Sequence, residues 1–330
     1  MKNQRITLHD IASLAGVTPM TVSRYLRTPE KVTPQTSQRI AAVINEIGYQ
    51  PDTDNPQISG QATARIGVLI PSFHNQIFPS LLAGVEAALS NTGYKTVVVS
   101  YDYDPLREEE QIAALLAMQI KGIILTETVH TLRAEKYLKA SGIPVAEVMG
   151  NQCQPGRICV GFDNQQAGFD MTRLLLARGK KQIIYFGAMS DHRDRLRYSG
   201  YCEAMQQAGL RPGQITPNKI SSVSVGNGMM GVARQKYPQV DGILCTNDDL
   251  AVGVLQECLQ AGIQVPAQLS IAGFHGLEIG QVTPLKLASV ITPRFAIGKT
   301  VTEIMLRSIA GQETPAHVDL HYQLSCGETL

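Results

Sequence analysis

The amino-acid sequence predicts an α/β protein, with a small three-helix head at the N-terminus followed by a core of parallel strands and helices. Three observations lead to this fold class. Apolar residues recur at helical spacing in the first fifty residues, and short runs of Val, Ile and Leu alternate with helical segments from Arg65 onward. A stretch rich in turn-forming residues separates the two regions. We therefore expect a helix-turn-helix head over residues 1–50, a hinge linker over 51–64 and a core over 65–330.

Three short helices are predicted in the head. The first and third each carry an apolar stripe at i, i+3, i+4 and i+7. These stripes are Leu8, Ile11, Ala12 and Ala15, and Ile40, Val43, Ile44 and Ile47. Thr18 is expected to cap the second helix with Pro19 at its first position, and Thr33 and Pro34 repeat that arrangement before the third. With Gly16 in the turn between the first two helices, this pattern is typical of a helix-turn-helix unit.

The composition of the whole chain is that of an ordinary globular protein. Hydrophobic residues make up 44% and charged residues 17% of the 330 positions, which excludes wholesale disorder. The net charge of +1 does not by itself favour binding to nucleic acid or to a membrane. The sequence has no apolar signal segment at its N-terminus and no run of 18 apolar residues. We expect a cytoplasmic protein with no membrane association.

The six cysteines form no Cys-x-x-Cys pair and lie in apolar or helical surroundings. They are Cys153, Cys159, Cys202, Cys245, Cys258 and Cys326. This pattern favours buried, reduced thiols over a metal or redox site.

Positive charge is concentrated in the head. Residues 1–50 hold six basic and three acidic side chains, a local charge of +3, whereas residues 61–330 hold 23 of each. Such a charge on a small three-helix unit suits contact with DNA phosphates. The alternative is a three-helix cap whose charges are only solvated.

The order of residues in the head favours DNA binding. Residues 6–51, above all the stretch DIASLAGVTPMTVSRYL, resemble the headpiece of the LacI/GalR family of bacterial transcription regulators. The resemblance implies sequence-specific binding of double-stranded operator DNA by the second helix. It assigns DNA contacts to Thr18, Pro19, Met20, Thr21, Ser23 and Arg24.

Within this set, Pro19 and Met20 stand where the family discriminates base edges, and the others suit phosphate or mixed contacts. Neither of these two side chains offers a hydrogen-bond donor, so any discrimination must be apolar, for example against a thymine methyl group. A methionine on a short helix more often belongs to the core. Here Val22 and Leu26 already fill the core face of the helix, which leaves Met20 outside.

The hinge linker departs from the family pattern. In the family this stretch folds into a short helix on DNA and inserts an apolar side chain into the minor groove, and Ile58 is at the matching position. Asp52 and Asp54, however, place negative charge near the phosphates, and Pro56 permits a helix only if the helix begins there. We expect a hinge that folds weakly or late.

The core is predicted to consist of parallel strands that alternate with helices. Candidate strands are 65–71, 95–100, 121–127, 144–149, 157–162, 182–187, 242–246, 269–274, 288–291 and 318–323. Continuous apolar runs of this kind are typical of strands buried on both faces, and ligands bind such sheets at the carboxyl ends of the strands. No GxGxxG, GxxxxGK[ST], HExxH or GxSxG motif occurs at those ends. Because His130, His192 and His275 are dispersed, we expect no metal site and no cofactor.

The core resembles the effector-binding core of the LacI/GalR family, a fold shared with periplasmic sugar-binding proteins. The segments LIPSFHNQIFPSLLAGVE, VGFDNQQAG, ILCTNDDLAVG and LASVITPR carry the likeness. It implies two doubly wound subdomains, one over 65–161 plus 293–322 and one over 162–292 plus 323–330, with the effector in the cleft between them. It also implies that the chain crosses between the subdomains near 160–162, 291–293 and 322–324.

Residue by residue, the resemblance assigns effector contacts on both sides of the cleft. These are Ser72, Asn75, Phe78 and Thr126 from the first subdomain, and Asp163, Arg197, Asn247 and His275 from the second. His275 departs from the family pattern, which has an acidic residue there. Without that carboxylate, His275 and the always-charged Arg197 favour a ligand carboxylate. The alternative is that His275 only forms hydrogen bonds within its own loop. Glu127 and Glu147 either select the hydroxyl pattern of the ligand or are solvated.

Within the family, these segments are most similar to the regulators of gluconate and L-idonate utilisation. That likeness implies a linear sugar acid, such as gluconate, idonate or a ketogluconate, as the effector. We therefore expect a regulator of sugar-acid catabolism genes, with repression as the default, and no enzymatic activity. The alternatives are a regulator of the same class with a neutral sugar or purine effector, or a sugar-acid binding protein that does not bind DNA.

A homodimer is expected because the family's operators are pseudo-palindromic. The apolar positions Leu81, Leu82, Val85 and Leu89 could face either the sheet or a partner chain. No heptad segment follows the last predicted strand, which favours a dimer over a tetramer. The resemblance implies that effector binding changes the spacing of the two heads, so that effector and operator are coupled by about 1–3 kcal/mol.

The hinge gives a first testable prediction. Replacing Asp52 by Asn and Asp54 by Ala in one chain should tighten operator binding several-fold, because two charges that the phosphates repel are removed. A fluorescence titration with operator DNA at fixed salt measures the effect. An unchanged operator affinity would contradict this account of the hinge.

Overall fold

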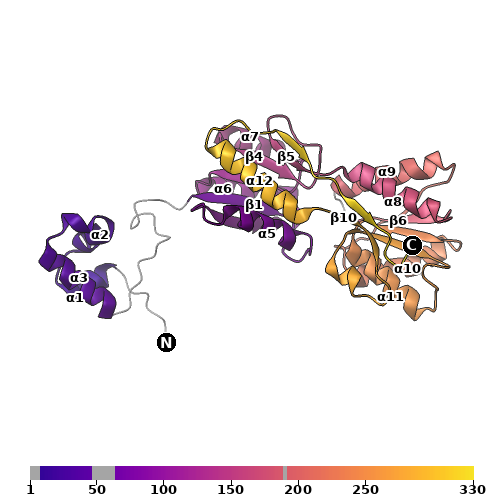
Figure 1. Ribbon diagram of the computed structural model, residues 1–330, viewed down its shortest axis with the longest axis horizontal. Helices are drawn as coiled ribbons and strands as arrows, with labels where there is room; N and C mark the ends of the chain where they lie inside the picture. Colours follow the sequence, from indigo (N-terminus) through magenta and orange to yellow (C-terminus); the bar gives the residue numbers. More distant parts are fainter. Residues whose placement is uncertain (1–7, 47–63, 189–191) are drawn as a thin grey trace. The chain divides into compact units, whose positions relative to one another are not determined.

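The computed structural model describes residues 8–46, 64–188 and 192–330, and the chain divides into two compact units. One unit contains the N-terminal head and the other contains the sheets and helices of the chain from Arg65 onward (Figure 1). The hinge positions Asp52, Asp54 and Ile58 lie outside the described residues.

The head consists of three helices around a small apolar core. They are α1 (Leu8–Ala15), α2 (Pro19–Arg27) and α3 (Pro34–Glu46), with a 3-10 turn, η1 (Pro29–Lys31), between the last two. Ile11, Val22 and Ile40 are fully buried where the helices meet, so the described part of the predicted stripes does form the core, and Ile47 lies outside the described residues. The three helices are confirmed, and η1 was not predicted.

Arg39 of α3 fastens the turn between α1 and α2. Its Nη2 donates to the backbone oxygen of Ala15 and, at 3.0 Å, to that of Gly16. Gly16 itself has a φ of +61°, in the left-handed region that favours glycine. Arg39 was counted with the positive charge available to DNA; these contacts show that it also positions α2.

The core unit contains two six-stranded sheets within the residues that the structure describes. The first has the order β11-β5-β4-β3-β1-β2 and the second β12-β10-β9-β8-β6-β7. The first sheet is built from β1 (Arg65–Ile70), β2 (Lys95–Ser100), β3 (Gly122–Leu125), β4 (Val145–Val148), β5 (Ile158–Gly161) and β11 (His317–Asp319). The second is built from β6 (Ile183–Phe186), β7 (Gly213–Ile215), β8 (Gly242–Cys245), β9 (Ser270–His275), β10 (Ala288–Ile291) and β12 (Gln323–Ser325). The pairing of β10 with β12 is antiparallel, while β9 runs parallel to both β8 and β10.

Helices cover both sheets. The first sheet carries α5 (Phe78–Leu89), α6 (Pro105–Ala117), α7 (Leu132–Ser141) and α12 (Arg294–Ile309). The second carries α8 (Asn164–Ala177), α9 (His192–Gln207), α10 (Val223–Lys236), α11 (Asp248–Gln260) and the 3-10 turn η2 (Glu278–Gln281). On α5, Leu81, Val85 and Leu89 are buried within the single chain, whereas Leu82 is half-buried. Three of the four positions therefore face the chain's own core. Among the described helices, none is both long and apolar enough to cross a lipid bilayer.

Three helix pairs pack closely through reciprocal glycines. The pairs are Gly84 with Gly298 for α5 and α12, Gly168 with Gly200 for α8 and α9, and Gly226 with Gly253 for α10 and α11. A Cβ atom at any of these positions would lie 1.9–2.3 Å from a backbone oxygen of the partner helix. These contacts therefore require glycine, and they set how closely each helix pair packs.

The chain passes between the two sheets after β5, after β10 and after β11, at 162–163, 292–293 and 320–322. Aromatic rings gather beside these crossings, since the ring centroid of Phe162 lies 6.3 Å from those of Phe274 and Tyr322. The expected single strand over 318–323 is wrong. His321 has a φ of +42°, which interrupts the extended chain, so β11 joins the first sheet and β12 the second. Strand β7 was not predicted.

Two of the six cysteines are paired, which corrects the expectation that all thiols are reduced. Cys153 and Cys159 form a disulfide, with their Cα atoms 5.7 Å apart. Cys159 of β5 lies opposite Glu147 of β4 in the sheet. Cys153 lies in the connection between these two strands, which folds back towards Cys159, so two cysteines six residues apart in sequence meet. That proximity depends on strand pairing and leaves no Cys-x-x-Cys signal. The other four, Cys202, Cys245, Cys258 and Cys326, are free.

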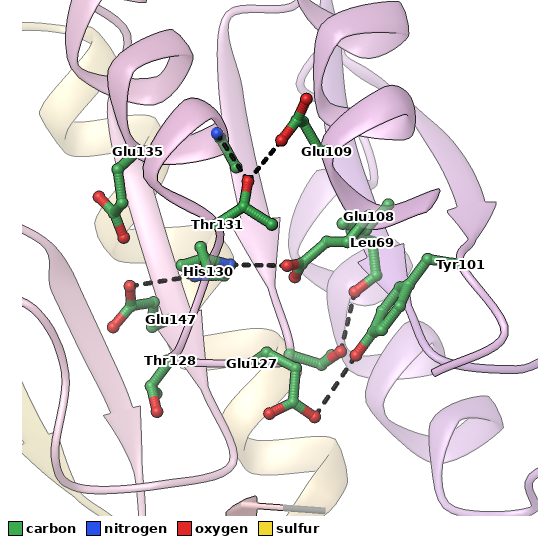
Figure 2. A network of polar contacts seen from close by, with 12 residues as sticks. Leu69, Tyr101, Glu108, Glu109, Glu127, Thr128, His130, Thr131, Glu135 and Glu147 are labelled. Atoms are coloured by element: carbon green, nitrogen blue, oxygen red, sulfur yellow. Dashed lines mark hydrogen bonds and ion pairs between the residues drawn. The ribbon is translucent and has the colours of Figure 1, made fainter. Parts of the chain in front are cut away.

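A buried charge network fastens the connection between β3 and α7. The His130 side chain is fully buried, with its Nδ1 3.0 Å from Glu108 Oε2 and its Nε2 3.4 Å from Glu147 Oε1 (Figure 2). Arg157 pairs with both Glu147 and Glu135, which extends the network towards β5. Burial alone would lower the pKa of His130, but its two carboxylate partners outweigh burial and raise that pKa to about 9.

This raised pKa predicts how the stability of the core depends on pH. Because the folded pKa of about 9 exceeds the usual value of His, the contribution of His130 is complete below about pH 6.5 and is lost as the pH rises through 9. At about 1.4 kcal/mol per pKa unit, the loss amounts to roughly 3 kcal/mol. Urea unfolding of the wild type should become easier over this interval. The His130→Gln variant should be less stable at pH 6.5 and should lack this part of the pH dependence.

The matched control is His317→Gln, because the His317 side chain is exposed. The pKa of His130 can also be read directly from an NMR titration of its ring protons. An apparent pKa near 6.5 would contradict the charged network.

Candidate functional site

The outward face of α2 carries the residues that the sequence assigns to DNA. Thr18 caps the helix, its Oγ1 accepting the backbone N–H of Thr21 at 3.2 Å, and Pro19 occupies the first helical position. Met20 is 71% exposed while Val22 is fully buried, as expected from the pattern. Thr18, Pro19, Met20 and Arg24 are exposed, and Thr21 and Ser23 are half-buried. The face is therefore available to a ligand.

A cleft in the core unit is lined from both sheets. Ser72, His74, Asn75, Ile77, Tyr103 and Met149 come from the first subdomain. Ala188, Arg193, Arg197, Ile220, Ser221, Thr246, Asn247, Asp249 and His275 come from the second. Most of these residues follow the carboxyl ends of β1, β6, β8 and β9, so the strand tips converge as the parallel arrangement predicts.

Arg197 lies at the centre of the second subdomain's wall. Its Nε donates to Asn164 Oδ1 at 2.9 Å, and its Nη1 donates to the backbone oxygen of Thr246 at 2.7 Å. The guanidinium carbon lies 3.9 Å from the centroid of the Phe274 ring, a cation–π contact. With 5% exposure, this guanidinium is held rigidly, and its charge reaches the cleft.

His275 supports Arg197 as a neutral ring. Its Nε2 lies 3.2 Å from Arg197 Nη1, and its Nδ1 lies 3.2 Å from Thr292 Oγ1. Complete burial, followed by the charges of Arg197, Arg294 and Arg193, lowers the pKa of His275 well below its usual value. The neutral ring therefore accepts a hydrogen bond from Arg197 Nη1 at Nε2 and donates one from Nδ1 to Thr292 Oγ1. The positive charge of the cleft comes from arginine, and His275 adds none, which refines the role expected for this residue.

The backbone at His275 is held in an uncommon conformation. Its φ is +99°, and the loop that follows is tied down by Asp248, whose carboxylate accepts the Leu277 N–H at 2.6 Å and the Ser289 hydroxyl at 2.7 Å. Burial raises the pKa of Asp248 to about 7, although these two hydrogen bonds act to lower it. Positive φ in a non-glycine residue persists only where the surroundings enforce it, and such positions cluster at binding sites.

Arg193 lies one turn before Arg197 on α9 and reaches the first subdomain. Its Nη1 donates to the backbone oxygen of Thr126 at 3.0 Å, and its Nη2 donates to Glu127 Oε1 at 3.0 Å. The side chain is 9% exposed and also lines the cleft. With Arg197, it gives the cleft two guanidinium groups.

The structure brings together five of the eight expected effector contacts. Ser72, Asn75, Arg197, Asn247 and His275 line the cleft. Phe78, Thr126 and Asp163 are not among the lining residues. Phe78 is 1% exposed, the Thr126 hydroxyl donates to the Leu69 backbone oxygen at 3.0 Å, and the Asp163 carboxylate caps α8 through the N–H of Gln166.

Comparison with known proteins now identifies the family. A model of the bacterial regulatory proteins of the LacI family matches residues 7–52, and a model of the periplasmic binding proteins and sugar-binding domain of the LacI family matches residues 63–325. The chain belongs to the LacI family. It is 46% identical to the HTH-type transcriptional regulator IdnR and 45% identical to GntR, both of Escherichia coli K12, with 100% of each chain covered. A LacI-family regulator from Silicibacter pomeroyi matches in structure with a TM-score of 0.86 and 31% identity, covering 98% of this chain and 99% of the other.

Membership of the LacI family establishes the general function. The protein is a DNA-binding transcription regulator with a helix-turn-helix head, and its family and relatives are regulators rather than enzymes. The roles of individual residues at DNA and effector stay predictions. Ile58, the last of the assigned DNA contacts, lies outside the described residues.

Several lining residues were missed by reasoning from the sequence. Arg193 had a usable signal, since it stands four residues before Arg197, a spacing that puts both side chains on one face of a helix. Ser221 had none, because it lies in an irregular connection between β7 and α10. Its Oγ is buried and has no hydrogen-bond partner within the described residues, which makes it a candidate contact for a ligand hydroxyl.

Proposed function

We propose that this LacI-family regulator is a repressor of sugar-acid catabolism genes, and that its effector is a linear sugar acid bound in the core cleft. The protein would act as a cytoplasmic homodimer on pseudo-palindromic operator DNA. Support for the ligand class comes from the charge of the cleft and from the resemblance of its segments to gluconate and L-idonate regulators.

The observation that carries this proposal is the pair of guanidinium groups on α9. Arg193 and Arg197 both line the cleft and are both buried, whereas Asp249 is the one acidic side chain among the described lining residues. Burial raises the pKa of Asp249. Fixed, poorly solvated guanidinium groups bind a carboxylate more strongly than a neutral hydroxyl.

The remaining lining residues suit the hydroxyl-bearing chain of such a ligand. Ser72, Asn75, Asn247 and Ser221 offer hydroxyl and amide groups from both sides of the cleft. Tyr103 is held by the Asn75 amide, whose Nδ2 donates to its hydroxyl at 2.9 Å. Polar groups on two sides allow one extended ligand to bridge the subdomains, and the operator affinity then changes by linkage.

Thermal unfolding of the purified chain tests the ligand class. Gluconate, idonate and 5-ketogluconate are compared with ribose, galactose and a purine, each well above its expected dissociation constant. Ligand at a hundred times its Kd adds about 2.7 kcal/mol of stability, which corresponds to a rise in Tm of roughly 5 °C or more. One sugar acid should give this shift and should weaken operator binding in a titration. Stabilisation by a neutral sugar or purine alone would leave the regulator assignment standing and overturn the ligand class.

A substitution at His275 tests the electrostatics of the cleft. In His275→Asp, the new carboxylate would lie beside Arg197 and compete for it, so sugar-acid affinity should fall at least tenfold. His275→Asn is the matched control, because asparagine keeps a neutral acceptor and tolerates positive φ. It should retain most of the affinity. Full retention in the Asp variant, measured by calorimetry, would refute this role of His275.

A further inference from the structure

Arg193 holds a carboxylate of the chain itself at the edge of the cleft. The contact joins α9 of the second subdomain to the end of β3 in the first, through Arg193 Nη2 and Glu127 Oε1 at 3.0 Å. The pair is poorly accessible, with side-chain exposures of 9% for Arg193 and 16% for Glu127. Its attraction is therefore screened less than that of a surface ion pair.

Glu127 is also held from its own side. The Tyr101 hydroxyl donates to the same Oε1 at 3.4 Å, and Figure 2 shows the two side chains together beside the end of β3. The buried Glu108–His130–Glu147 network fixes the connection that directly follows Glu127. These contacts hold the Glu127 carboxylate in position beside Arg193. Of the two residues, Arg193 lines the cleft and Glu127 does not.

We propose that Glu127 is an intramolecular counter-ion of Arg193, and that the carboxylate of the effector takes its place when the ligand binds. The inference rests on the proposed sugar-acid function and deepens it by naming the residue pair that selects for charge. Glu127 is a specificity-determining residue that acts through Arg193. It need not touch the ligand.

The geometry allows one contact to change while the other persists. Arg193 Nη1 donates a hydrogen bond to the backbone oxygen of Thr126, a contact separate from the one that Nη2 makes with Glu127. The Nη2 group can then exchange the carboxylate of Glu127 for that of the ligand, and Glu127 keeps the Tyr101 hydroxyl as a donor.

This exchange discriminates between acids and neutral sugars. A ligand carboxylate replaces one negative charge by another, so Arg193 stays compensated throughout. A neutral polyol cannot do so, and displacing Glu127 in its favour would break this poorly solvated ion pair without replacing it. Glu127 would therefore weaken the binding of every ligand that needs Arg193, and would weaken the binding of neutral ligands most.

The test compares the wild type with Glu127→Gln. The amide keeps an oxygen that can accept from Arg193 and Tyr101, so the contact geometry is conserved and only the charge is lost. Glu109→Gln is the matched control. Glu109 belongs to the same subdomain, pairs with Arg133 and accepts from Thr131, and has no described contact with Arg193. Calorimetry is carried out with D-gluconate and L-idonate, and with D-glucitol and L-iditol, in which a CH2OH group replaces the carboxylate.

Glu127→Gln should bind the sugar acid that the wild type prefers about tenfold more tightly, since the competing charge is gone. Its unliganded Tm should fall and its ligand-induced rise in Tm should exceed that of the wild type, because the ligand carboxylate restores an ion pair that the substitution removes. Glu109→Gln should match the wild type in affinity. Affinity for the sugar acid that is equal or weaker in Glu127→Gln would overturn the exchange, and would make the pair a plain structural contact.

A second variant guards against an indirect effect of Glu127→Gln. Adding Arg193→Gln should abolish the gain in affinity, because the guanidinium that Glu127 competes for is then gone and Arg197 is the one arginine left among the described lining residues of the cleft. A gain that survives in the double variant would overturn the role of Arg193. If the wild type binds neither acid but binds a neutral polyol, the proposed ligand class and this inference fail together. If it binds an acid and only the Glu127 result fails, the ligand class stands.

Discussion

The cleft depends on the hydrogen bonds that hold the buried guanidinium group of Arg197. A charge with 5% exposure is tolerated only where its donors find acceptors, and here they find Asn164, Thr246 and the neutral ring of His275. These partners come from the start of α8, the end of β8 and the end of β9. The hydrogen bonds of the guanidinium are therefore complete only when three separate elements of the second subdomain are correctly placed. The position of the charge in the cleft thus depends on the packing of all three.

Close packing of helices supplies much of that placement. A Cβ on Gly168 of α8 would lie 2.3 Å from the backbone oxygen of Arg197 itself, so the two helices touch at the residue that forms the wall. The loop after β9 needs a different device, because a positive φ at His275 must be enforced. Asp248 does this through Leu277 and Ser289. Close helix packing fixes the backbone position of Arg197, and the buried carboxylate of Asp248 fixes the conformation of the loop after β9.

Sequence periodicity predicted the parts of this protein that depend on local patterns. The stripe of Leu8 and Ile11, the proline after Thr18 and the apolar runs of the sheets each follow from spacing along the chain. What it missed depends on contacts between distant residues. The proximity of Cys153 and Cys159 arises from strand register, and the neutral state of His275 arises from burial beside three arginines. The contact of Arg193 with Glu127 spans 66 residues and two sheets. No local pattern encodes such a pair.

The position of Arg193 bears on how binding in the cleft could be transmitted. A ligand shifts a conformational equilibrium only by the difference between its affinities for the two states. A ligand held wholly by one subdomain would offer no such difference when the subdomains move. Arg193 is part of α9 in the second subdomain, but it donates a hydrogen bond to Thr126 at the end of β3 in the first subdomain. Its side chain also lines the cleft. A ligand that engages this side chain changes the contact that joins the two sheets. Recognition and conformational coupling then draw on the same guanidinium group, so a change in how the effector engages Arg193 also changes a link between the subdomains.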